Sequence, residues 1–206
     1  MKDLELIYPL ILPFAPGVAD PTMNAWIRQA ARDFCERTRL WRYEDELTVT
    51  ANEAEAITTP VGSVVHEIEE AYFDGQMLRR VSPAWLDEHE KLWRLGALTG
   101  SSSYVTQTEP GSIRLVPGAA GTVKLFVWLK PSDDAEELPD FIIDKYREII
   151  AHGALARILM IPNQSFSNPQ MATYWQTRFD TKLDNLFTKG SSGEQRAARR
   201  TKASFY

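Results

Sequence analysis

The sequence contains few of the residues on which covalent or metal chemistry depends. Among its 206 residues there is one cysteine, and there are three histidines. A single cysteine cannot form an intramolecular disulfide, and three scattered histidines offer no metal-ligand pattern. No run of apolar residues approaches the 18 or so that a membrane-spanning helix needs. We therefore expect no enzymatic activity, no catalytic residue, no metal site, no cofactor and no membrane partner.

Two stretches match a catalytic motif only in part. The stretches "HEIEE" at His66 and "HEKLW" at His89 begin like the HExxH motif of zinc proteases. Their fifth positions are Glu70 and Trp93, so the second histidine is missing. The carboxylate clusters of the chain are interpreted as solvated faces, because these residues are usually exposed.

Cys35 is the one thiol, and its surroundings in sequence favour a structural role. It shares an apolar helical stripe with Phe34, and free cysteine is among the most buried residue types. The complete stripe consists of Trp26, Ile27, Ala30, Ala31, Phe34 and Cys35. We expect Cys35 to pack in the core.

Three segments show the apolar periodicity of amphipathic helices. The first begins at Asp20, the expected N-cap, with Pro21 in its first turn. The other two cover about 139–161 and 168–188, and the short loop between them predicts an antiparallel helix hairpin. The first helix has no other helical partner of similar length, so we expect it to pack on this hairpin.

Residues 43–130 have the pattern of strands. Segments rich in β-branched and aromatic residues alternate with turn signals, and Asp74-Gly75 predicts a two-residue hairpin. One short helix over about 82–96, capped by Ser82, interrupts them. The sequence therefore predicts an α+β fold with three parts: an antiparallel helical bundle (1–42 and 131–188), an inserted β-rich domain (43–130) and an extended basic C-terminal tail (189–206).

The tail differs in charge from the rest of the chain. Five basic residues and one glutamate give it a net charge of +4. Because the whole chain has a net charge of −5, the remainder has a net charge of −9. A basic segment without a hydrophobic stripe does not build a core of its own, and we expect it to bind a partner. The expected contact residues are Arg196, Arg199, Arg200, Lys202, Phe205 and Tyr206.

Three stretches of structural residues follow one another in a distinctive order. The first is "YPLILPFAPGVADP", the second is "AARDFCERTRLWR", and the most specific is "LPDFIIDKYREIIAHGALARILMIP". The last one follows a strand pair, an "LKP" exit and an acidic link. This order, over most of residues 8–188, resembles the head-to-tail adaptor, or neck, proteins of tailed bacteriophages. Because the matching residues are structural, the resemblance bears on fold and role rather than on a catalytic site.

The resemblance implies a structural virion protein, similar to the tubular tail protein A of short-tailed phages. By this likeness we expect a homo-oligomeric ring of twelve copies beneath the portal protein. Such a ring extends the channel through which dsDNA passes without sequence readout, and it docks the next neck or tail protein. The implied location is the virion neck, after synthesis in the cytoplasm of the host bacterium. The portal is then the expected partner of the basic tail.

Two alternatives stay open from the sequence. A phage-encoded hydrolase would need convergent ionisable groups in one pocket, and no residue spacing predicts one. A tail-completion or terminator protein of the same neck region could share the β-rich insertion and the basic tail. Contacts with the tail tube instead of the portal would distinguish it from an adaptor.

Overall fold

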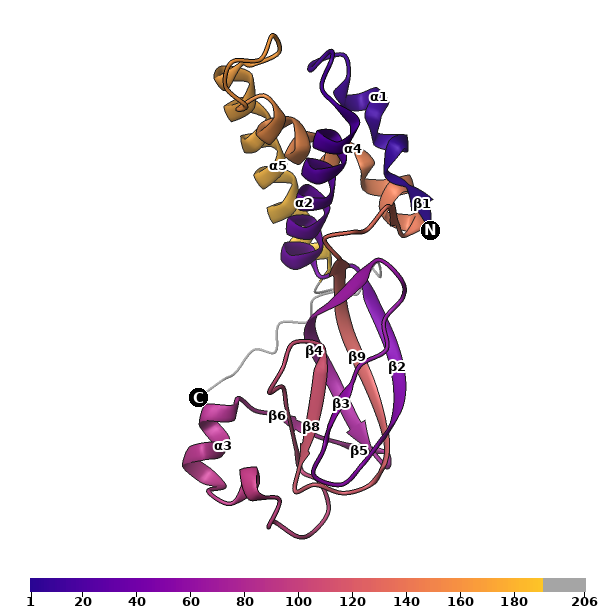
Figure 1. Cartoon of the computed structure of the whole chain (residues 1–206), viewed down its shortest axis with the longest axis vertical. Coiled ribbons are helices and arrows are strands. Elements are labelled where there is room, and N and C mark those ends of the chain that lie inside the picture. Colours follow the sequence, from indigo (N-terminus) through magenta and orange to yellow (C-terminus); the bar gives the residue numbers. More distant parts are fainter. Residues whose placement is uncertain (191–206) are drawn as a thin grey trace, which may run out of the picture. The chain divides into compact units, whose positions relative to one another are not determined.

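A computed structural model describes residues 1–190, and the six predicted partner-binding residues of the tail lie outside this part of the chain. Helices and sheets are both present, which confirms the α+β class (Figure 1). The helices are η1 (Leu4–Ile7), α1 (Tyr8–Ile11), α2 (Asp20–Thr38), α3 (Pro83–His89), η2 (Trp93–Leu95), α4 (Asp140–Ile158) and α5 (Pro169–Gly190). The strands are β1 (Lys2–Asp3), β2 (Arg42–Val49), β3 (Ala54–Ala56), β4 (Ser63–Phe73), β5 (Gln76–Met77), β6 (Arg79–Arg80), β7 (Tyr104–Thr106), β8 (Ser112–Val116), β9 (Gly121–Pro131) and β10 (Glu137–Leu138).

The chain divides into two compact units. The β unit consists of Met1–Leu4 and Trp41–Ile143, and the helical unit consists of Glu5–Leu40 and the chain from Asp144 onward. Helix α4 begins in the first unit and continues into the second. Independent folding of an inserted β-rich domain with the predicted limits stays a prediction.

Strand β9 organises the β unit. It lies between β2 and β4, antiparallel to both, in a sheet with the order β2-β9-β4-β5. Alternate β9 side chains are completely buried, as expected for a strand with one face in the core. The β4–β5 hairpin turns at Asp74 and Gly75, both with positive φ, as a two-residue hairpin requires. The predicted hairpin is therefore confirmed.

The second sheet has the order β3-β8-β7-β6, and the short pair β1–β10 was not expected from the sequence. The helix predicted over 82–96 is wrong in extent, because α3 ends at His89 and only η2 follows. Ser82 does cap α3, since its Oγ accepts a hydrogen bond from the Trp85 N–H. The break lets the indole N–H of Trp93 turn back to the Asp87 carboxylate, at 2.9 Å.

The long helices of the helical unit follow the predicted periodicity. The N-cap of α2 is Ala19, whose side chain makes no capping bond, and Asp20 occupies the first helical position instead. The predicted cap was therefore one residue late. Helix α5 begins after Asn168, whose side-chain oxygen accepts from the Met171 N–H, and it runs to Gly190. Helix α4 ends at Ile158, three residues before the predicted end.

Candidate functional site

Helices α2, α4 and α5 approach one another closely at Gly153. A Cβ atom at this position would lie 2.9 Å from the Ala30 Cβ in α2 and 2.9 Å from the Phe179 ring in α5. Only glycine fits without a shift of these neighbours. Phe34 of α2 and Tyr146 of α4 add a ring contact with centroids 5.1 Å apart. The three helices thus share one core, in which Cys35 of α2 is completely buried.

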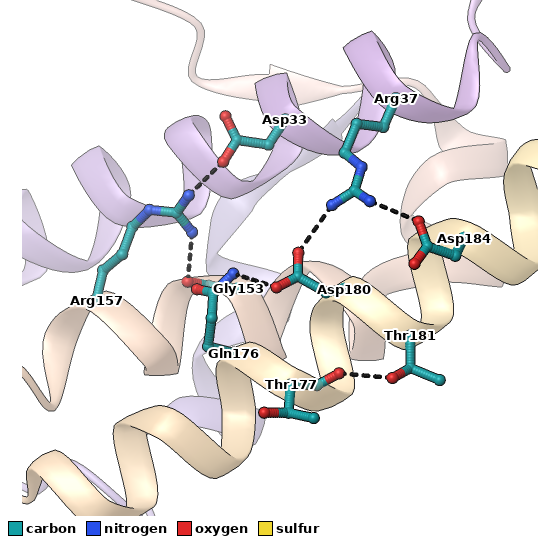
Figure 2. A network of polar contacts seen from close by, with 9 residues as sticks. All are labelled: Asp33, Arg37, Gly153, Arg157, Gln176, Thr177, Asp180, Thr181 and Asp184. Atoms are coloured by element: carbon teal, nitrogen blue, oxygen red, sulfur yellow. Dashed lines mark hydrogen bonds and ion pairs between the residues drawn. The ribbon is translucent and has the colours of Figure 1, made fainter.

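A network of polar contacts joins the same helices along the surface of this core (Figure 2). Arg157 of α4 donates to the Gly153 carbonyl at 2.7 Å and pairs with Asp33 of α2. Arg37 of α2 donates to Asp180 at 2.8 Å and to Asp184 at 2.5 Å, both in α5. Because single exposed ion pairs contribute little, we assign this network to fixing helix register more than to overall stability.

An apolar groove opens beside the network. It has a volume of about 580 Å³ and is formed by α2, by the end of α4 with the turn that follows, and by the first half of α5. Its walls include Trp26, Met160, Ile161, Ala172, Thr173 and Gln176. Met160 is 58% exposed, although a thioether side chain gains free energy on burial. We refer to this feature as the helix groove.

The helix groove carries little charge of its own. Arg157 is the one ionisable side chain among its lining residues, and Asp33 already pairs with it. Gln176 is held by a hydrogen bond from its amide to Asp180, at 3.0 Å. A partner of neutral, apolar surface therefore fits the groove better than a charged segment does.

A second apolar surface lies at the N-terminal end of the helical unit. From Leu6 to Val18 the chain has no Asp, Glu, Lys, Arg or His. Leu6, Leu12 and Phe14 are between 40% and 46% exposed, although Ile7 and Ile11 between them are buried. Phe14 rests edge-on against Trp175 of α5, with ring centroids 5.1 Å apart. We call Leu6, Leu12 and Phe14 the N-terminal ridge.

The side chains considered for chemistry do not converge. Burial raises the pKa of the Cys35 thiol far above its ordinary value, with a further contribution from Glu36, so the thiol stays protonated and unreactive. His66 lies in β4, His89 stacks on Trp85, and His152 stacks on Trp175. In the part of the chain that the structure describes, no three His, Cys, Asp or Glu residues come together as a metal site.

The sequence prediction placed the functional residues elsewhere. Arg196, Arg199, Arg200, Lys202, Phe205 and Tyr206 all lie outside the described residues, so their contacts stay a prediction. The helix groove was missed, because its lining side chains come from three helices and their convergence depends on tertiary packing. The N-terminal ridge does have a sequence signal, which is the uncharged run from Leu6 to Val18.

The comparison with protein-family models gives a match over nearly the whole chain. The model described as SU10 adaptor protein covers residues 8–203. The chain belongs to this family. A comparison with curated proteins finds no match.

Membership supports a structural role as a phage head-to-tail adaptor and a place in the virion neck. It also supports interaction with other head or tail components. None of the helices among residues 1–190 has the length and apolar character needed to cross a membrane. The closer likeness to the tubular tail protein A stays a prediction.

Proposed function

We propose that this adaptor forms a homo-oligomeric ring of about twelve copies below the portal and extends the DNA channel toward the tail. The family match over residues 8–203 is the observation that carries this proposal. The helix groove and the N-terminal ridge support it, since exposed apolar surfaces often mark protein–protein contacts.

The charge distribution fits a channel through which DNA slides. Residues 191–206 have a net charge of +3. Because the whole chain has a net charge of −5, residues 1–190 have a net charge of −8. Attractive contacts with phosphates would hold DNA in place, and a net acidic body reduces them. The ring would then conduct dsDNA without reading its sequence.

The basic tail is proposed as the contact with the portal. Its four basic side chains supply charge-assisted contacts, and Phe205 and Tyr206 supply apolar anchors. These four residues are Arg196, Arg199, Arg200 and Lys202.

The test of the ring is the mass of the assembly in solution. Native mass spectrometry of the full chain, alone and mixed with portal protein, should give a complex of one portal with about twelve adaptor copies. A chain that ignores the portal but multimerises with tail-tube subunits would be a tail-completion or terminator protein. A chain that stays monomeric with both would contradict the adaptor proposal.

The portal contact has its own variant. A chain that ends at Gly190 should keep its fold, measured by circular dichroism and thermal unfolding, and should fail to join portal-containing heads. The matched control keeps the tail but replaces Gln195, which adds no charge to it, with alanine. Truncated protein that still completes heads would contradict the assignment of the tail.

A further inference from the structure

The helical unit exposes two apolar surfaces that cannot satisfy one another within one copy. The N-terminal ridge flanks α1, with Leu6 in η1 before it and Leu12 and Phe14 after it, and the helix groove is lined by α2, α4 and α5. Figure 1 shows α1 and α5 on either side of α2. Along α5 the two surfaces also use different positions, since Trp175 contacts Phe14 of the ridge, whereas Thr173 and Gln176 line the groove.

The chemistry of the groove limits its occupant. No carboxylate lines it, and Asp33 already pairs with its Arg157, so a basic segment such as residues 191–206 would gain no ion pair with the lining residues. The N-terminal ridge brings no charge at all, because Leu6 to Val18 contain no acidic or basic residue. Leucine and phenylalanine side chains are also of the kind that an apolar groove buries with a gain in free energy.

We propose that the helix groove of one copy receives the N-terminal ridge of a second copy. This inference rests on the proposed ring and names its contact surfaces. The contact is heterologous, since one copy contributes Leu6, Leu12 and Phe14, and the next contributes the groove wall at Trp26, Met160 and Thr173. A repeated heterologous contact closes into a ring when the rotation between copies closes.

The single buried cysteine allows a direct test by cross-linking. Cys35 is completely buried, so engineered cysteines on the surface react selectively. The double variant Leu12→Cys with Thr173→Cys places one thiol on the ridge and one in the groove. Treated with a short bismaleimide, as the full chain alone and with portal protein, it should give a ladder of covalent multimers.

The single variants provide the matched controls. Leu12→Cys alone and Thr173→Cys alone should give no covalent multimers, and a mixture of the two should give dimers without a ladder. Dimers from either single variant would reveal a symmetric contact and overturn the proposal. The absence of a ladder while native mass spectrometry of the unmodified chain shows multimers would also overturn it, and would leave the ring itself standing.

A charge introduced on the ridge tests the same contact without cross-linking. Leu12→Glu should weaken association of the copies at least tenfold, measured by native mass spectrometry or light scattering. The control is Met77→Glu, which alters an equally apolar and more exposed side chain in the β unit, 63% exposed. Both variants should unfold at the temperature of the parent chain. Equal association of the two variants, or of Leu12→Glu and the parent, would contradict the proposal.

Discussion

Gly153 sets how closely the helices of the helical unit approach. An alanine there would gain about 1 kcal/mol in helix propensity. Its methyl group would meet Ala30 and Phe179 at 2.9 Å, and overpacking of this kind costs about 1–3 kcal/mol. We expect Gly153→Ala to lower the free energy of unfolding, measured in urea. Thr181→Ala, on the exposed face of α5, should stay within about 0.5 kcal/mol of the parent. A more stable Gly153→Ala variant would show that the neighbours move freely.

His152 gives the helical unit a dependence on pH. Its ring stacks on Trp175, and burial lowers its pKa from 6.5. Arg178 and Lys182 of α5 lower the pKa further, and Glu148 of α4 opposes them. The unfolded chain therefore binds a proton more readily than the native chain does. The stability from neutral His152 is present above pH 6.5 and is lost as pH falls through the lower native pKa.

The corresponding variant is His152→Gln, which cannot titrate. We expect the melting temperature of the parent to decline between neutral and mildly acidic pH, and the decline to be smaller in the variant. His89→Gln, at an exposed site of the β unit, is the control and should behave like the parent. Parallel declines in the parent and His152→Gln would assign the effect to other groups.

At the scale of elements, one carboxylate joins the two sides of the break between α3 and η2. Asp87 accepts from Trp93 at 2.9 Å and from Arg94 at 2.7 Å through two donors. Hydrogen bonds from Arg94 and then Trp93 lower the pKa of Asp87 from 3.8 to about 2. The stabilising effect is thus present above pH 3.8 and is lost as pH falls toward 2.

Asp87→Asn should remove this dependence and loosen the packing of Trp93, which is 2% exposed in the native chain. We expect tryptophan fluorescence of the variant to shift to longer wavelength, because the indole gains contact with water. Glu88→Gln, a neighbouring carboxylate of α3, should leave the spectrum unchanged. A native-like spectrum for Asp87→Asn at neutral pH would mean that packing alone holds Trp93.

The elements differ in how far local sequence determines them. The periodic apolar stripes of α2 and α5 and the Asp74-Gly75 turn are local signals, and each led to the correct element. The pairing of β2 with β9 joins segments some 80 residues apart, for example Tyr43 with Val127, and no local pattern specifies it. The same holds for β1 and β10, which are two residues each. The helix predicted over 82–96 was too long, because the contacts that Asp87 makes with Trp93 and Arg94 across the break cannot be recognised from helical periodicity.

At the scale of the whole molecule, the α+β class and the adaptor family were accessible from sequence, whereas the helix groove was not. The class follows from alternating periodicities, and the family follows from the order of structural residues over most of the chain. The groove requires Trp26, Met160 and Thr173 to meet from three helices. Such convergence arises from packing, and a single sequence contains no direct record of it.

The separation of charge predicts how the molecule treats DNA. A chain that ends at Gly190, with its net charge of −8, should not shift a dsDNA fragment in a gel even at low salt. Any retention by the full chain should come from the tail and fall steeply with salt, by a slope of about −0.9 per phosphate contact. The control replaces the four basic tail residues with glutamine. Salt-resistant binding of dsDNA by the truncated chain would contradict the proposal that an acidic channel lets DNA slide through.

The uncharged run from Leu6 to Val18 has a thermodynamic consequence. An interface built on such a surface gains nothing from low ionic strength, weakens on cooling and strengthens in sulfate, because its free energy comes from the release of water. The proposed contact of the basic tail with the portal should respond in the opposite way, since dissolved ions would screen it. Chilling the assembled complex should therefore loosen the copies from one another, whereas raising sodium chloride should detach them, still joined, from the portal.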